Sequence, residues 1–141
     1  MANALLGRIH LSGRIPELEP EARALVHEAV AAYKAIRGDL PGAVPSWPLG
    51  LPRWDDPWIA LALRAPATTY LTVWRRPGTD ITATLRLPHL RDTAARVDLP
   101  YPSASRAVPA WTPDTAELSP TLPTAPSAVL LRITATDPGA L

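Results

Sequence analysis

The sequence predicts an α+β fold in which one amphipathic helix is followed by an antiparallel β-sandwich. Residues 18–37 carry apolar side chains at the three- and four-residue spacings of one helical face. From Pro41 onward the pattern changes to short segments in which apolar and polar residues alternate, with most of the 18 prolines among them. A long helix and a series of short strands therefore account for most of the chain.

The helix over residues 18–37 has consistent signals at both ends. Pro20 suits the first turn, where a backbone N–H has no intrahelical partner, and Pro41 prevents the helix from continuing. Lys34 and Arg37 lie near the expected C-terminus, where the helix dipole favours positive charge. The apolar stripe consists of Ala22, Leu25, Val26, Ala29, Val30, Tyr33, Ile36 and Leu40. A continuous stripe of this length needs a large apolar surface to pack against.

The residues before the helix are apolar around Gly7 and end in a turn at Ser12-Gly13. We interpret Leu5–Leu11 as a short strand, which would form one βα unit with the helix. Parallel strands lie in sheets whose faces are covered by crossover helices. A single βα unit therefore cannot complete such a sheet by itself.

The remaining chain contains five segments with the pattern of strands. Trp58–Arg64 is apolar at nearly every position, which is typical of a strand covered on both faces. The other four alternate between apolar and polar residues: Thr68–Arg75, Asp80–Leu87, Ala95–Tyr101 and Ser127–Thr134. Even spacing and a strong turn signal at Pro77-Gly78 favour an antiparallel sandwich.

Prolines interrupt this pattern between Pro102 and Pro126. Proline has no backbone N–H to donate to a β-ladder, so it is disfavoured in central strands. We expect edge segments and loops in this region, with a short strand near Thr115–Leu118.

The composition excludes several functional classes. The net charge is +1, from 14 basic and 13 acidic residues that are scattered, so the concentrated basic face of a nucleic-acid-binding protein is missing. Cysteine is absent, which excludes disulfides and thiolate metal sites. No apolar run reaches the length of a membrane span, and no signal peptide is visible. The compartment is unknown, and the cytoplasm is the default expectation.

No residue pattern predicts a catalytic, cofactor-binding or metal-binding residue, and substrate-binding residues stay unknown. Asp55 and Asp56 are adjacent, but the paired carboxylates of glycosidases face one another across a sugar. We interpret them as part of a turn. His10, His27 and His89 lack the spacing of a metal site, and there is no glycine-rich phosphate loop.

The most unusual segment is 45–58, which contains Trp47, Trp54 and Trp58 among several prolines. Two interpretations remain open. Indole rings bind the apolar faces of sugars, so the segment could be a carbohydrate-binding platform, which Trp111 could extend. Tryptophans are also large and usually mostly buried. The favoured interpretation is that they fill the boundary between the helix and the sandwich.

Several motifs together resemble the C-terminal end of α-galactosidases of glycoside hydrolase family 36. The resemblance begins at Gly7–Arg14 and Leu18, Pro20-Glu21, and continues at Tyr33-Lys34-Ala35-Ile36-Arg37, Trp47-Pro48-Leu49-Gly50-Leu51-Pro52 and Trp54-Asp55-Asp56-Pro57-Trp58. In that family a (β/α)₈ barrel ends in a helix with a Tyr-Lys-x-x-Arg pattern, and an antiparallel sandwich follows. The segment Leu122–Ile133 looks like the last strand of that sandwich.

The resemblance implies a division into three parts: residues 1–44 as the last βα unit of a barrel that is not in this chain, 45–58 as a connector, and 59–141 as the sandwich. The family's two catalytic Asp residues lie on earlier barrel strands, and no residue here matches them. Residues 7–13 would lie near the barrel face that carries active sites and could at most line the sugar pocket. The implied context is hydrolysis of α-linked galactosides, without a cofactor.

These observations make the chain a C-terminal fragment of an α-galactosidase-like glycosidase, structural in role and inactive alone. The expected partner is a separately encoded catalytic barrel or a second copy of the chain, bound through helix residues such as Leu25, Val26, Ala29, Val30 and Tyr33. No nucleic acid or membrane is expected to bind. The alternative is a small carbohydrate-binding or protein-assembly sandwich module.

Overall fold

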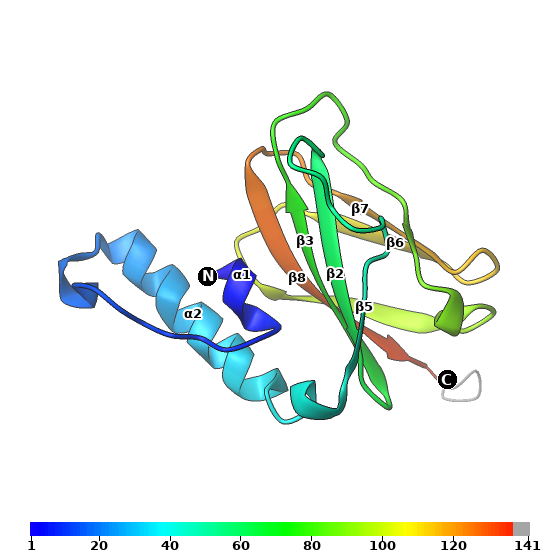
Figure 1. Ribbon diagram of the computed structural model, residues 1–141, viewed down its shortest axis with the longest axis horizontal. Helices are drawn as coiled ribbons and strands as arrows, with labels where there is room; N and C mark the ends of the chain where they lie inside the picture. Colours follow the sequence, from blue (N-terminus) through cyan, green and yellow to red (C-terminus); the bar gives the residue numbers. More distant parts are fainter. Residues whose placement is uncertain (137–141) are drawn as a thin grey trace.

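The structure, a computed structural model, describes residues 1–136. Within these residues, two antiparallel sheets pack face to face, and two α-helices cover the outer face of the larger sheet (Figure 1). The five-stranded sheet has the order β1-β2-β3-β8-β5, and the three-stranded sheet has the order β4-β7-β6. The expected α+β class with an antiparallel sandwich is confirmed.

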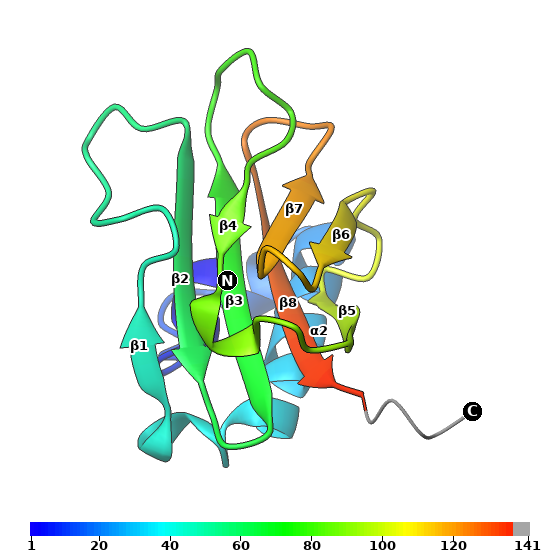
Figure 2. The ribbon, with the colours of Figure 1, turned by 90° about the vertical axis from the view of Figure 1, so that its right-hand side faces the viewer.

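The larger sheet agrees closely with the sequence pattern. Its strands are β1 (Val44–Ser46), β2 (Trp58–Arg64), β3 (Thr68–Arg75), β8 (Ser127–Ala135) and β5 (Ala95–Tyr101). The expected boundaries of β2, β3 and β5 are correct, and β8 is one residue longer than expected. The short strand β1 was not expected, and it forms the outer edge beside β2 (Figure 2).

The smaller sheet consists of β4 (Leu85–Arg86), β7 (Glu117–Thr121) and β6 (Val108–Thr112). The helices are α1 (Ala2–Leu5) and α2 (Pro20–Ile36), and short 3₁₀ turns lie at Ile15–Glu17, Leu40–Gly42 and Pro88–Leu90. The expected helix over residues 18–37 is therefore confirmed to within two residues at each end. Pro20 occupies its first turn and Lys34 its last, as the sequence predicts.

Alternation along the strands divides the buried residues between two cores. Leu71 and Val73 of β3 face the smaller sheet, whereas Tyr70 faces the helices. On β8, Leu131 belongs to the core between the sheets and its neighbour Leu130 to the core under the helices. The central strands of the larger sheet are thus covered on both sides, which accounts for their nearly continuous apolar sequences.

The helical layer is fixed to the sheet by apolar packing and by three hydrogen bonds. Ala29 and Ile36 of α2 are fully buried against the sheet and α1. Tyr70 Oη donates to Asp39 Oδ2 at 2.5 Å, and Trp74 Nε1 donates to Asn3 Oδ1 at 2.7 Å. The Glu28 carboxylate accepts a hydrogen bond from the Ser103 backbone N–H. These contacts attach the start of α1 and both the middle and end of the α2 segment.

The strand expected at Leu5–Leu11 is not present. Leu5 ends the short helix α1, and residues 6–14 form an irregular segment that runs back along α2 (Figure 1). The physical reason is that a parallel strand needs a neighbour to complete its backbone hydrogen bonds. Among the described residues no strand lies beside this segment, and Leu5, Leu6 and Ile9 instead pack in the core under the helices.

The prediction of a strand at Asp80–Leu87 is mostly wrong, because only Leu85–Arg86 forms a strand, β4. The buried guanidinium of Arg75 accounts for part of this difference. It donates to the backbone carbonyls of Gly78, Asp80 and Leu122 at 2.9–3.1 Å. The segment is thereby held as a crossing between the two sheets, and it pairs with the smaller sheet only through scattered contacts such as the bridge from Thr82 to Thr121.

The proline-rich region forms more strand than expected, since both β6 and β7 lie in it. Pro109 and Pro120 are directly opposite one another in the β6–β7 pair. The Pro120 carbonyl accepts from the Ala83 N–H, on the side away from β6. A residue's N–H and C=O point the same way in an antiparallel strand, so the missing donor of Pro120 also points away from β6. The pairing of β6 with β7 therefore loses no hydrogen bond at Pro120.

We predict that Tyr70→Phe lowers the free energy of unfolding by about 1 kcal/mol at neutral pH, because it removes the hydrogen bond to Asp39. Burial, together with Asp39, raises the pKa of Tyr70 from 10.0 to about 12. The folded state thus favours the protonated phenol, so this stabilisation is present below pH 10 and is lost as the pH rises from 10 towards 12. Urea unfolding from pH 8 to 12 measures both effects. The same pH dependence in Tyr70→Phe as in the parent would contradict this assignment.

Candidate functional site

The tryptophans of segment 45–58 have different environments. Trp58 is 8% exposed, so it is buried as expected, but it lies in the core between the two sheets and not at the expected boundary between the helix and the sandwich. Trp47 is 44% exposed and Trp54 is 94% exposed. The expectation that these indoles fill a boundary is therefore wrong for Trp54, which lies in a loop that leaves the sheet between β1 and β2. Trp111 is half-buried, and its Nε1 donates to the Thr93 carbonyl at 2.9 Å.

Asp55 and Asp56 form a turn, as expected. Asp56 Oδ2 accepts the Arg53 backbone N–H at 2.7 Å, and the exposed Asp55 carboxylate lies 3.9 Å from the Arg53 guanidinium. These contacts involve only neighbours in the sequence. The two aspartates therefore stabilise the turn that precedes Pro57.

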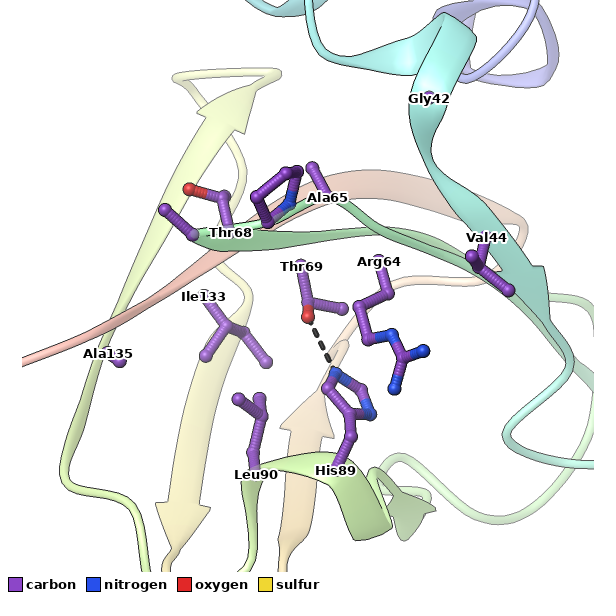
Figure 3. A pocket seen from close by; sticks show the side chains of 12 residues that line it. Gly42, Val44, Arg64, Ala65, Thr68, Thr69, His89, Leu90, Ile133 and Ala135 are labelled. Atoms are coloured by element: carbon purple, nitrogen blue, oxygen red, sulfur yellow. Dashed lines mark hydrogen bonds between the residues drawn. The ribbon is translucent and has the colours of Figure 1, made fainter.

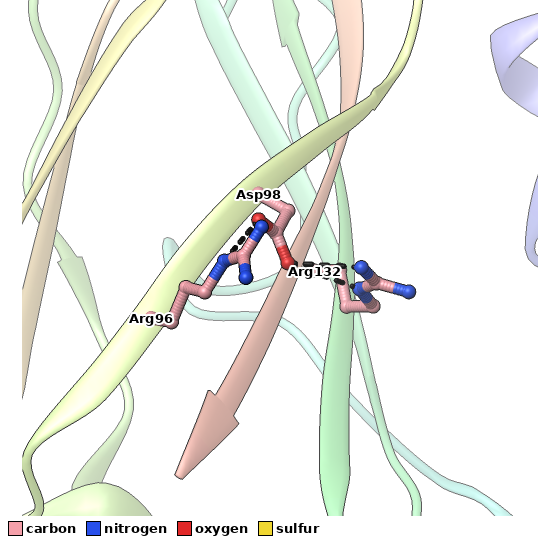
Figure 4. A network of polar contacts seen from close by, with 3 residues as sticks. All are labelled: Arg96, Asp98 and Arg132. Atoms are coloured by element: carbon pink, nitrogen blue, oxygen red, sulfur yellow. Dashed lines mark hydrogen bonds and ion pairs between the residues drawn. The ribbon is translucent and has the colours of Figure 1, made fainter. Parts of the chain in front are cut away.

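A second carboxylate, Asp98 on β5, is neutralised by two arginines (Figure 4). Arg132 of β8 donates to Asp98 Oδ2 at 2.9 and 3.3 Å, and Arg96 donates to Oδ1 at 2.6 Å. The hydrogen bond from Arg132, with support from Arg96, holds the pKa of Asp98 below its ordinary value. An acid held ionised in this way is poorly suited to donate a proton, so we assign the cluster a role in joining β5 to β8.

The three histidines do not come together. His10 and His27 are exposed on the helical side, whereas His89 lies on the 3₁₀ turn Pro88–Leu90 next to the sandwich. Within residues 1–136, no group of three or more His, Cys, Asp or Glu side chains could hold a metal ion. No helix in this range is both long and apolar enough to cross a bilayer.

The most developed concave surface lies at the open side of the sandwich, between the edge strands β1 and β4. Two cavities of about 470 and 560 Å³ adjoin there and share Val44, Arg64 and His89 as lining residues. Both volumes lie in the range of ligand pockets. We call this surface the edge groove, and its polar and aromatic lining consists of Ser46, Trp47, Arg64, Thr68, Thr69, Arg86 and His89.

Residues from separate elements meet in the edge groove. Arg64 ends β2, Thr69 is the second residue of β3 and Arg86 belongs to β4, while His89 follows on the 3₁₀ turn. Thr69 Oγ1 and His89 Nε2 are 2.8 Å apart, which fixes the imidazole (Figure 3). Burial, and then the positive charge of Arg64, lower the pKa of His89. The ring is therefore neutral at pH 7.

The charges that line the edge groove are positive. Arg86 Nε is 3.5 Å from Glu117 Oε1, so its charge is partly balanced from outside the lining. The side chain of Arg64 has neither a hydrogen bond nor an ion pair with any described residue. No Asp or Glu appears among the described lining residues of the two cavities. Sequence reasoning missed this site, because its members are separated along the chain and carry no spacing motif.

Residues 7–13, which the family resemblance would place near a sugar pocket, lie on the opposite side of the larger sheet. Ile9 and Leu11 line a smaller cavity of about 330 Å³ with Val30 and Tyr33 of α2, and Lys34 and Arg37 complete its wall. We call this surface the helix groove. It contains no carboxylate among its described lining residues. Its apolar floor suits packing against another apolar surface.

The comparisons with known proteins identify a similar fold. No family model matches the chain, and no curated protein sequence matches it. Among solved structures, the galactosidase domain of an alpha-galactosidase-sucrose kinase, AgaSK, is similar with a TM-score of 0.58. The match covers 86% of this chain with 15% sequence identity, and it spans only 17% of that chain's length. The sandwich with its helical layer is therefore a galactosidase-like fold.

The different environments of the tryptophans predict different mutational effects. Trp58→Ala should lower the free energy of unfolding by about 3–5 kcal/mol, because it leaves a cavity in the core. Trp54→Ala should change it by less than about 0.5 kcal/mol, because the side chain is exposed. Trp58→Phe is the matched control. It keeps an aromatic ring in the core and removes an indole N–H that has no hydrogen-bond partner among the described residues. It should therefore lower the free energy of unfolding less than Trp58→Ala does.

Chemical denaturation of the three variants measures these differences. If Trp54→Ala lowered the free energy of unfolding as much as Trp58→Ala does, the Trp54 side chain would be packed in solution, which would contradict its exposed position.

Proposed function

We propose that this chain is the C-terminal accessory part of an α-galactosidase-like glycoside hydrolase of family 36, and that it does not catalyse hydrolysis by itself. The observation that carries the proposal is the similarity to part of a galactosidase domain. The family motifs at Tyr33–Arg37 and Trp47–Trp58 support the specific family. In that family, the sandwich follows the last barrel helix, which corresponds here to α2.

The arrangement of carboxylates supports a structural role. A retaining glycosidase needs two carboxyl groups about 5 Å apart on opposite sides of the scissile bond. Asp98 is held by two arginines, and Asp55 and Asp56 shape a turn. The edge groove and the helix groove lack acidic residues among their described lining residues. In the proposed enzyme, the acid and the nucleophile come from the barrel.

The proposed partner of the helical layer is this catalytic barrel. In the helical layer, Leu11 is 49% exposed and lines the helix groove, and Leu25 is 41% exposed beside Tyr101 and Ala128 of the larger sheet. A larger body that covered these residues would remove apolar surface from water. Ala29, which we expected at this contact, is instead buried against the chain's own sheet, so it cannot contribute. In the absence of the barrel, self-association would cover the same surface.

A carbohydrate-binding module is the second candidate function. The exposure of Trp47 and Trp54 favours it, because solvent-facing indoles are available to stack on sugar rings. The burial of Trp58 and the partial burial of Trp111 remove those two residues from such a platform.

The purified chain should not hydrolyse an aryl α-galactoside. Without a nucleophile and an acid, most of the transition-state stabilisation is missing, on the order of 10 kcal/mol or more. Release of the aryl group, followed by absorbance, measures the reaction. Turnover that a single Asp or Glu substitution in this chain abolishes would disprove the proposal.

Changing Leu25 and Val30 together to Lys should shift the chain from self-associated species towards monomer without lowering its melting temperature. The reason is that Leu25 is 41% exposed and Val30 lines the helix groove, so neither belongs to the buried core under the helices. Ala29→Lys is the contrasting control, since a charge at this fully buried position should unfold the helical layer. Sedimentation velocity and thermal unfolding provide the measurements. A parent chain that is monomeric at high concentration, and that unfolds when Leu25 and Val30 are charged, would show that this surface belongs to the chain's own core.

A further inference from the structure

The edge groove exists because the two sheets have different widths. On one side of the sandwich, β5 and β6 lie close together and Trp111 Nε1 bonds to the Thr93 carbonyl, which closes the gap. On the other side, the larger sheet continues through β2 to β1, while the smaller sheet ends at the two-residue strand β4. The space between β1 and β4 is therefore left open and is lined by this chain's residues alone.

The electrostatics of this space favour an anion. Arg64 has no partner among residues 1–136, and its side chain and the His89 ring face the same space in Figure 3. A guanidinium binds a carboxylate through two parallel hydrogen bonds, which adds both strength and orientation. Arg86 adds positive charge on the opposite strand, although Glu117 balances it in part. No described carboxylate lines the cavities to repel an anionic ligand.

The remaining lining favours a ligand with hydroxyl groups and an apolar face. Trp47 lines the groove beside Arg64 and keeps 44% of its surface exposed, so an indole surface is available for stacking. His89 Nε2 is engaged by Thr69, and the other ring nitrogen, Nδ1, has no hydrogen bond to any of residues 1–136 and can bind a hydroxyl group in either tautomer. Ser46 supplies a further hydroxyl at the edge. An indole face, neutral polar groups and a guanidinium together match a sugar that carries an acidic group.

We propose that the edge groove binds an anionic saccharide, with its acidic group held by Arg64 and a pyranose face stacked on Trp47. The site consists of residues from β1 and the loop after it, from β2, β3, β4 and β8, and from the turn at Pro88–Leu90, so it does not require the galactosidase partner. It also gives the carbohydrate-binding alternative a location and a ligand class. Trp54, which is more exposed, lies outside the lining of both cavities and is not part of the site.

Binding of trigalacturonate to the intact chain tests the proposal. Isothermal titration calorimetry should detect binding, and full methyl esterification of the same trisaccharide should weaken it at least tenfold because the carboxylates are lost. Increasing salt should also weaken binding, since the site is open to solvent. In the unmodified protein, the NMR signals of the His89 ring should shift on titration, whereas those of His10 and His27 should not.

Substitutions with matched controls locate the site. Arg64→Gln and Trp47→Ala should each weaken binding at least tenfold. Arg23→Gln changes an exposed arginine on α2, and Trp54→Ala changes an exposed tryptophan of the same loop, so both should retain affinity within twofold. All four positions are exposed, and thermal unfolding of each variant verifies that it is folded.

Several outcomes would overturn the proposal. Equal affinity for the esterified trisaccharide would show a neutral-sugar site. Equal affinity for inorganic phosphate, unaffected by Trp47→Ala, would show a simple anion site. Loss of binding in Trp54→Ala but not in Trp47→Ala would place the platform elsewhere. If trigalacturonate at millimolar concentration neither bound nor shifted the His89 signals, the site would be rejected. The proposed galactosidase role would not be affected, because the hydrolysis assay and the Leu25/Val30 variant test it separately.

Discussion

The structure depends on a five-stranded sheet that is apolar on both faces. On β8, Leu131 points to one side and Leu130 to the other, and both are fully buried. Full burial of each such side chain contributes about 1.5–3 kcal/mol, so neither face of the sheet can be left in water without a large loss. The smaller sheet covers one face and the helices cover the other. The three-layer arrangement is therefore a direct consequence of these central strands.

The two coverings are built differently. The smaller sheet joins the core between the sheets through buried leucines such as Leu85 and Leu118, and Arg75 fixes the crossing segment through three backbone carbonyls. The helical layer presents small residues such as Ala29 to the sheet, with polar ties at Asp39 and Glu28. It leaves Leu25 and Leu11 partly exposed. This links the fold to the proposed function, because a large partner of the helical layer would cover these apolar side chains.

The edge groove follows from the same architecture. A sheet of five strands cannot be matched along its whole width by a sheet of three, and the exposed edge strand β1 extends beyond the smaller sheet. The functional groups at this edge are arginine, histidine and tryptophan, whereas Asp56 shapes a turn and Asp98 forms an ion pair elsewhere in the described chain. Such a site suits recognition of a ligand more than cleavage of a glycosidic bond. The two proposals thus assign different surfaces to different tasks.

The sequence determined the elements whose periodicity is enforced by burial. Residues 20–36 show the apolar spacing of a helix, β3, β5 and β8 show the alternation of strands, and β2 is a short apolar run typical of a strand covered on both faces. Tertiary structure decided the conformation of the segments that lack such a periodic pattern or a neighbouring strand. The segment around Gly7 has no neighbouring strand to pair with, and residues 80–84 are held by Arg75 rather than by a ladder. Trp54 and Trp58 are four residues apart in similar sequence, yet only Trp58 lies on an inward-facing strand position. The edge groove likewise required the fold, because it unites residues that no spacing connects and that meet only where one sheet extends beyond the other.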